Sequence, residues 1–114
     1  MIEPVLYLGI RVPQLATLVK YGLELPEWER MVRRFDGACW VCEERPAGHL
    51  LVIDHEHVLF FKRLPPEKRK RYVRGVCDVI CNGRILSRFA TPKRLRGAAR
   101  YLEEYAEGSE WLPS

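Results

Sequence analysis

The sequence has no long apolar stretch, no internal repeat and no low-complexity segment. A membrane-crossing helix needs about 20 consecutive apolar residues, and because no such run occurs we expect no membrane contact. The first ten residues have no basic stretch ahead of an apolar one, so we expect no secretory signal and a cytoplasmic location. With 114 residues, 47% of them hydrophobic, the sequence predicts a single compact domain over residues 1–114.

Acidic residues are almost missing from one part of the chain. Residues 62–100 hold thirteen of the nineteen Lys and Arg but only two acids, Glu67 and Asp78, so this segment has a net charge of +11. The whole chain carries only +4, so the positive charge is concentrated on one flank. Such a flank is typical of a protein that binds a polyanion. The alternative is a solvated charged face without a ligand.

Cysteine is also scarce, and its spacing is regular. The only four cysteines form a C-x2-C pair, Cys39 and Cys42, and a C-x3-C pair, Cys77 and Cys81, with 34 residues between the pairs. In a reducing cytoplasm such pairs more often bind a metal than form disulfides. Two tight pairs supply the four thiolates of a tetrahedral zinc ion, so we predict a structural zinc site. The alternative is four unrelated small apolar side chains.

Hydrophobic periodicity and capping residues predict an α+β chain. Helices are expected over residues 14–21, 26–35 and 78–89, and strands over 50–53 and 72–76. A last helix is expected over 91–107, with Thr91 as N-cap. Its apolar stripe is expected to face the core, and consists of Leu95, Ala98, Ala99, Leu102 and Tyr105. The chain would then consist of an N-terminal helical part (13–36), a core around the cysteines (37–90) and a C-terminal helix.

The segment Asp54-His55-Glu56-His57 follows the first predicted strand directly. It combines an acid that can hold a hard cation with two imidazoles that titrate near neutral pH. Side chains alternate along a regular strand, so Asp54 and His55 can share a site only if the strand ends or bulges there. The alternative is a merely polar strand end.

These signals occur together in an order typical of one family. The chain resembles the recombination endonuclease VII family of bacteriophages, a branch of the His-Me finger (ββα-metal, HNH-like) nucleases, over roughly residues 18–106. The matching segments are 21–30, Cys39-Trp40-Val41-Cys42, Asp54-His55-Glu56-His57, Val73-Arg74-Gly75 and Cys81-Asn82. The resemblance implies a small zinc-stapled ββα-metal core between N-terminal helices and a C-terminal helix.

The resemblance also implies roles for individual residues. Asp54 and Asn82 would hold a catalytic Mg²⁺, or alternatively Mn²⁺, and His55 would be the general base. His57 would contact the phosphate or the leaving group. We add Arg74, whose guanidinium next to the site could bind a phosphate with two hydrogen bonds. The zinc ion would be structural, with no open coordination position.

The chain departs from the family pattern at the second cysteine pair. Typical members have C-x2-C there, but here position 78 is Asp and the cysteine stands one residue earlier. The fourth zinc ligand is then Cys77, which we favour, or Asp78, because a carboxylate is an acceptable zinc ligand. A third alternative is a weakened or absent zinc site.

A second departure is an insertion at residues 58–71, between the Asp-His-x-His segment and the second predicted strand. Its basic residues would add salt-dependent, sequence-independent DNA affinity next to the site. They are Lys62, Arg63, Lys68, Arg69, Lys70 and Arg71.

The sequence therefore predicts a Mg²⁺-dependent DNA endonuclease. Either it resolves branched DNA such as a Holliday junction, or it nicks duplex DNA during phage DNA processing. Resolution needs two active sites, so a homodimer is expected in that case, with the helices of residues 14–35 as its interface. Phage packaging or recombination proteins are further expected partners, and the location would be the host cytoplasm. The alternative function is a non-catalytic zinc-containing module that binds nucleic acid.

Overall fold

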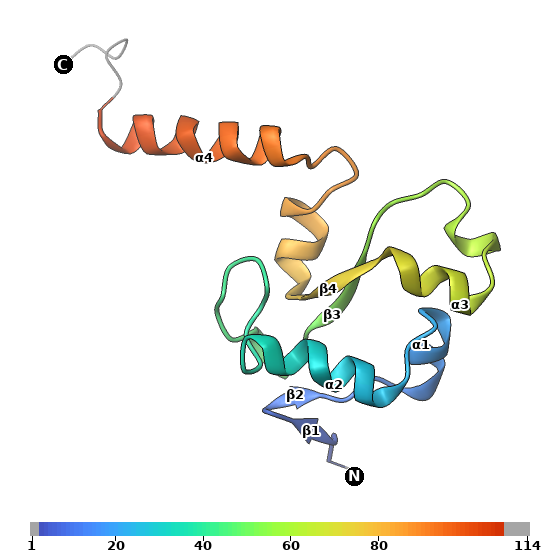
Figure 1. The fold of residues 1–114 in the computed structure, drawn as a ribbon. Helices are drawn as coiled ribbons and strands as arrows, with labels where there is room; N and C mark the ends of the chain where they lie inside the picture. The colour runs from blue at the N-terminus through green and yellow to red at the C-terminus, as the bar shows by residue number, and fades with distance from the viewer. Residues whose placement is uncertain (1–2, 109–114) are drawn as a thin grey trace.

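The structure, a computed structural model, describes residues 3–108 as an α+β fold with two small antiparallel sheets. Its elements follow one another along the chain as Figure 1 shows. They are β1 (Leu6–Tyr7), β2 (Ile10–Arg11), α1 (Leu15–Lys20), α2 (Leu25–Arg34), β3 (Val52–His55), α3 (Pro66–Arg69), β4 (Val73–Cys77) and α4 (Pro92–Ala106). Short 3-10 turns lie at Ala47–His49, Phe61–Arg63 and Lys70–Tyr72, and a π-helical turn at Cys81–Ile85.

The two N-terminal helices form where the sequence predicts them. A capping box starts α2, because Glu24 and Glu27 each receive a hydrogen bond from the other's backbone N–H. One face of α2 turns Trp28 and Val32 into the core, where both are fully buried. Between the helices, Gly22 has a positive φ of 68°, and a Cβ there would collide with the carbonyl oxygen of Pro66. This close approach fixes the end of α1 against α3.

The second sheet, β3 and β4, lies at the centre of the molecule (Figure 1). The two strands are the predicted ones, shifted by one or two residues, so that Asp54 and His55 are the last two residues of β3. The buried core packs around this pair of strands. Its members are Ile10, Leu18, Leu23, Trp28, Val32, Cys39, Leu51, Ile53, Val76, Cys77 and Cys81.

After β4 the chain is helical only over residues 79–85, and this helical segment ends at Leu86. The helix predicted over 78–89 is therefore shorter than expected. Its outer side chains Val79 and Ile80 are exposed, so little burial favours a longer helix. This short turn carries Cys81 and Asn82.

The C-terminal helix has the predicted limits but not the predicted surroundings. Thr91 caps α4 by accepting a hydrogen bond from the backbone N–H of Arg94 at 3.1 Å. No residue of α4 is buried, and Leu102 is 63% exposed. The prediction that its apolar stripe faces the core is wrong, because α4 extends away from the rest of the chain (Figure 1). The periodicity correctly predicted an apolar face on α4, but it does not show which partner buries that face.

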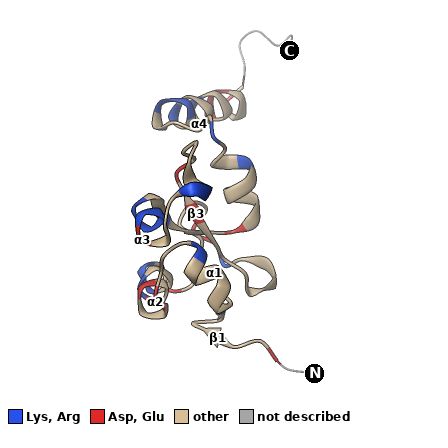
Figure 2. Cartoon of the chain, turned by 90° about the vertical axis from the view of Figure 1, so that its right-hand side faces the viewer, with Lys and Arg blue, Asp and Glu red and all other residues tan. Residues whose placement is uncertain are grey.

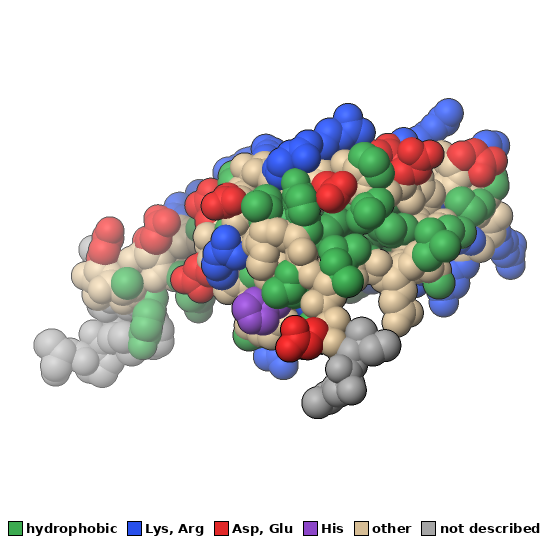
Figure 3. Space-filling view, turned by 90° about the horizontal axis from the view of Figure 1, so that it is seen from below, with side chains coloured by type: hydrophobic (Ala, Val, Ile, Leu, Met, Phe, Trp, Pro, Cys, Tyr) green, Lys and Arg blue, Asp and Glu red, His purple; other side chains and the backbone are tan. Residues whose placement is uncertain are grey.

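Exposed apolar side chains also gather on the N-terminal side of the molecule. Figure 3 shows this face, on which hydrophobic side chains cluster between scattered charged ones. Val5, Leu6 and Leu15 are among the exposed hydrophobic residues of this part. Within residues 3–108, no helix has the length and apolar character needed to cross a bilayer.

Candidate functional site

Four side chains converge into one group that could hold a metal ion: Cys39, Cys42, Asp78 and Cys81. Their ligand atoms all lie within 4.8 Å of one another. The fourth member is thus Asp78 rather than Cys77, the ligand that we favoured from the sequence. Cys77 ends β4 and turns inward, and because neighbouring side chains leave a strand on opposite sides, only one of the two can reach the group.

Backbone amides support this group. The sulfur of Cys39 accepts hydrogen bonds from the N–H groups of Val41 at 3.4 Å and Asp78 at 3.3 Å. Burial raises the pKa of Cys39, but these and other backbone N–H donors outweigh it and lower the pKa overall. The N–H of Cys81 donates to Asp78 Oδ1 at 2.7 Å and lowers the pKa of that carboxyl. Such donors favour the thiolate and carboxylate forms that bind a metal.

Trp40, which lies between Cys39 and Cys42 in the sequence, connects this group of metal-binding side chains (the metal group) to the central sheet. Its indole N–H donates to the carbonyl of Met31 at 3.1 Å, and its backbone N–H to that of Val76 at 3.1 Å. Its ring lies against Gly75, where a Cβ would collide with it. The glycine of the Val-Arg-Gly segment therefore allows the cysteine turn to dock on β4.

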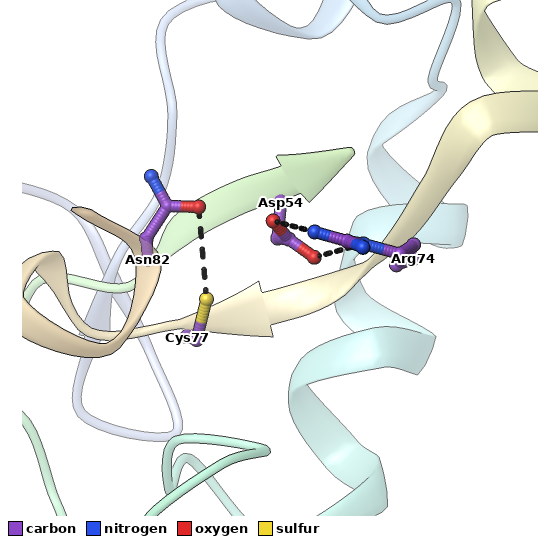
Figure 4. Close-up of polar contacts among 4 residues, drawn as sticks. All are labelled: Asp54, Arg74, Cys77 and Asn82. Atoms are coloured by element: carbon purple, nitrogen blue, oxygen red, sulfur yellow. Dashed lines mark hydrogen bonds and ion pairs between the residues drawn. The ribbon is translucent and has the colours of Figure 1, made fainter. Parts of the chain in front are cut away.

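The β3–β4 register shifts between Asp54 and His55, as a shared site would require. Asp54 pairs with Gly75 but His55 pairs with Val73, so Arg74 is the extra residue of a bulge. The guanidinium of Arg74 holds both oxygens of Asp54, at 2.7 and 3.0 Å (Figure 4). Asp54 is only 4% exposed, so this ion pair supplies the positive charge that a buried carboxylate needs.

Asn82 lies on the turn after β4, and its carboxamide oxygen faces the thiol of Cys77 at 3.9 Å (Figure 4). Burial, assisted by the negative charge of Asp54, raises the pKa of Cys77 to about 12. Cys77 therefore remains a neutral thiol. At this distance it is a weak donor, so the Asn82 oxygen keeps its capacity to bind a cation.

His55 is half-buried in an aromatic setting. Its ring stacks on Phe61, with ring centroids 4.1 Å apart and planes inclined by 19°. The rings of Tyr21 and His57 lie 5.6 and 5.4 Å away. Burial, and then the charge of His57, lower the pKa of His55 below its ordinary value of 6.5. The imidazole is therefore neutral at physiological pH and can accept a proton.

A hollow of about 420 Å³ opens beside the two histidines. It is lined by His55, His57, Val58, Leu59, Phe61, Lys62, Arg63 and Arg88. We call it the histidine groove. Arg88 was not among the predicted DNA-binding residues, although it lies within the basic segment 62–100 that the sequence singles out.

The other two members of the predicted site line neighbouring hollows. Asp54 and Arg74 line one of about 190 Å³, and Asn82 lines one of about 810 Å³. The structure therefore places Asp54, His55 and Asn82 around the same sheet without opening them to one common cavity. The ion pair with Arg74 is what holds the Asp54 carboxylate.

The basic residues of the insertion have two different roles. Arg69 donates to three backbone carbonyls, those of Phe61, Lys62 and Lys20, at 3.2, 2.8 and 3.0 Å. Lys70 forms an ion pair with Glu27. Both were predicted to bind DNA; the Arg69 guanidinium is held by these carbonyls, whereas Lys70 pairs with Glu27 and its side chain stays 48% exposed. The four others, Lys62, Arg63, Lys68 and Arg71, are exposed, and Figure 2 marks basic residues in blue on α3 and α4.

Comparison with known proteins identifies one family. The family model described as recombination endonuclease VII matches residues 14–104, from just before α1 to the last turns of α4. No curated protein matches the chain. No solved structure matches it either.

Proposed function

Because the chain belongs to the recombination endonuclease VII family, we propose that it is a metal-dependent endonuclease that hydrolyses phosphodiester bonds in DNA. The observation that best supports the proposal is the bulge at the end of β3, where Arg74 pairs with Asp54 and the next residue, His55, lines the histidine groove. The succession of β3, β4 and the short helical turn with Asn82 supports a ββα-metal core as part of this proposal. We treat residues 1–114 as one such nuclease domain.

Each side chain of the proposed site has a separate role in the reaction. We propose that His55, neutral at physiological pH, removes a proton from a water molecule that attacks the phosphorus. His57, on the same groove, contacts the phosphate. Asp54 and Asn82 would hold Mg²⁺, because one carboxylate and one carboxamide oxygen are the hard ligands that this ion accepts while keeping several waters. When bound, Mg²⁺ supplies positive charge that stabilises the phosphate and the leaving oxygen.

The second metal centre is proposed to be structural. Three thiolates and the Asp78 carboxylate fit a tetrahedral Zn²⁺ ion without an open position. This ion would join the cysteine turn of Cys39 and Cys42 to the end of β4. Because thiols must stay reduced to serve as ligands, we place the active protein in the cytoplasm.

One alternative function has an observation in its favour. Asp54 is paired with Arg74 and does not share a hollow with His55, which also suits a non-catalytic zinc-containing module that binds nucleic acid. The two functions differ in their need for Mg²⁺, because only a nuclease would require it for its activity.

Nicking of supercoiled plasmid in Mg²⁺ separates the two. We expect the wild-type protein to nick, and Asp54→Asn, which keeps the shape but loses the charge, to be at least about 100-fold slower. The matched control is Asp36→Asn, at an exposed aspartate whose backbone φ of 51° suits asparagine. Equal cutting by wild type and Asp54→Asn contradicts the assigned site. DNA binding without cutting by either protein supports the binding module.

Arg74 is proposed to act as a stand-in cation. We predicted a phosphate contact for it, but its guanidinium occupies the oxygens that would bind the metal ion. We propose that Arg74 would leave Asp54 when that carboxylate holds a metal ion, and that its guanidinium, whose side chain is 40% exposed, would then be free to bind a phosphate.

This exchange predicts the effect of Arg74→Gln on metal affinity. Without the competing cation, Mn²⁺ should bind the zinc-loaded protein at least about tenfold more tightly in calorimetric titration, since a charged hydrogen-bonded pair is worth about 1.5–3 kcal/mol. Arg71→Gln, at an exposed arginine, should leave the affinity unchanged. Unchanged or weaker Mn²⁺ binding by Arg74→Gln contradicts the exchange.

A junction-resolving role would require a homodimer, and we propose α4 as its interface rather than the helices of residues 14–35. In those helices Leu18, Trp28 and Val32 are already buried in the core, while Leu15 and Val19 stay exposed. The apolar side chains of α4 stay exposed, and its charges are divided between its ends (Figure 2). Residues 93–100 include four basic side chains and residues 103–107 three acidic ones, so antiparallel helices would pair opposite charges.

A further inference from the structure

The turn of residues 58–61 presents two large apolar side chains to solvent. Leu59 is 90% exposed, the highest value among the large hydrophobic residues that the structure describes, and Phe60 is 61% exposed. They occupy the corner of the turn, which a hydrogen bond from the N–H of Phe61 to the carbonyl of Val58 closes at 3.2 Å. We call Leu59 and Phe60 the wedge.

Contacts of the residues that follow the wedge hold this turn in place. Phe61, the residue directly after the wedge, is buried and stacks on His55, the proposed general base. Arg69 holds the backbone at Phe61 and at Lys62 through its guanidinium. Because both contacts lie directly C-terminal to the wedge, they limit how far the wedge can fold back onto the protein surface.

Positive charges surround the wedge on the groove side. Leu59 itself lines the histidine groove together with Lys62, Arg63 and Arg88. A phosphate backbone drawn into this groove by the three cations would bring its bases to the apolar tip. An apolar side chain between cationic ones is the arrangement with which proteins enter a DNA base step.

We infer that Leu59 and Phe60 insert between neighbouring bases and unstack them next to the scissile phosphate. The inference rests on the proposed nuclease function, because it assumes that DNA occupies the histidine groove. Unstacking is least unfavourable where bases are already poorly stacked, as at a mismatch or another flexible step. The wedge would therefore favour cleavage at such positions over perfectly paired duplex.

The test uses a duplex with 2-aminopurine, a base that becomes fluorescent when unstacked, next to a central mismatch. Zinc-loaded protein with His55→Gln, which is expected to bind in Mg²⁺ without cutting, should raise the fluorescence. Adding Leu59→Ala/Phe60→Ala should abolish that rise and weaken binding to the mismatched duplex about tenfold, since stacking on an aromatic ring is typically worth that much. The control pair Val5→Ala/Leu15→Ala, exposed at 72% and 76% away from the groove, should change neither.

Cleavage supplies the second reading. In the otherwise wild-type protein, Leu59→Ala/Phe60→Ala should remove the preference for mismatched over paired duplex while nicking of plasmid continues. An undiminished fluorescence rise together with an undiminished preference overturns the wedge and leaves the nuclease intact. A changed sedimentation coefficient with unchanged fluorescence also overturns it, and assigns the two side chains to a protein contact. If the wild-type protein cuts no DNA, the nuclease proposal fails, while the fluorescence still decides on the wedge.

Discussion

Replacing His55 by Gln is expected to slow Mg²⁺-dependent DNA cleavage by about 100- to 10,000-fold, the usual contribution of a general base. Gln keeps a polar group of similar reach but cannot take up a proton near neutral pH. DNA binding should be nearly unchanged, because the groove keeps Lys62, Arg63 and Arg88. The measurement is single-turnover cleavage of a labelled duplex, with affinity determined in parallel.

The pH dependence of the wild-type rate gives a further reading of the same role. The base must be neutral to act, and burial lowers the pKa of His55 below 6.5. The rate should therefore rise with pH through a value below 6.5 and stay level above it. In the His55→Gln protein this rise should be absent.

The matched control is His49→Gln, because His49 is exposed and its ring contacts only the carbonyl of Gly9 in the hydrogen bonds of the described residues. This variant should cleave like the wild type. A His55→Gln protein that cuts at the wild-type rate with the same pH profile would remove His55 from the mechanism. A His55→Gln protein that no longer melts cooperatively would make the residue structural.

Replacing Cys39 by Ser is expected to release zinc and to unfold much of the domain. Structural zinc in small domains contributes about 10–16 kcal/mol of binding free energy, as much as or more than the whole stability of a typical domain. Here the ion would connect two turns that are far apart in the sequence and lie next to the central sheet. Zinc content by elemental analysis and thermal melting by circular dichroism measure the two effects.

Two further variants identify the fourth ligand. Asp78→Ala should lose zinc like Cys39→Ser, whereas Cys77→Ser should keep one zinc ion per folded chain, because Cys77 faces Asn82 and not the metal group. Cys77→Ser is still expected to lower the melting temperature, since it places a hydroxyl in a buried position. Zinc retained by Asp78→Ala but lost by Cys77→Ser would reverse the assignment, and an unchanged melting curve for Cys39→Ser would contradict zinc altogether.

Local sequence patterns predicted most of the architecture. The capping box and apolar face of α2, the cap of α4 and the two central strands depend on residues close together in the chain. Side-chain alternation also indicated that Asp54 and His55 need a bulge, and the register shifts at that point. The recognition of the family rests on short motifs, and the match over residues 14–104 confirms it.

Features that depend on contacts between distant segments could not be predicted in the same way. Arg69 finds a carbonyl partner at Lys20, 49 residues away, and only the fold shows that its charge is engaged. The choice between Cys77 and Asp78 depends on the direction in which each side chain leaves β4. The exposure of α4 likewise depends on where the chain leads after Leu86, which periodicity does not encode.

The ion pair of Asp54 and Arg74 explains why the expected site is only partly assembled. A carboxylate that is 4% exposed needs a cation, and the guanidinium that emerges from the bulge supplies it. While this pair persists, Asp54 lines the hollow of Arg74 and Asn82 lines another. If a divalent ion competes with Arg74 for this carboxylate, the fraction of assembled sites would rise with the metal concentration. It would also rise when a phosphate binds the guanidinium of Arg74.

Anomalous diffraction from crystals of the zinc-loaded protein soaked with Mn²⁺ tests the central claim most directly. We predict a manganese peak within coordination distance of the Asp54 carboxylate and the Asn82 carboxamide oxygen, with Arg74 turned away from Asp54. This peak should be separate from the zinc peak among Cys39, Cys42, Asp78 and Cys81. A map with no manganese at Asp54, and with the Asp54–Arg74 pair intact at saturating Mn²⁺, would contradict the account.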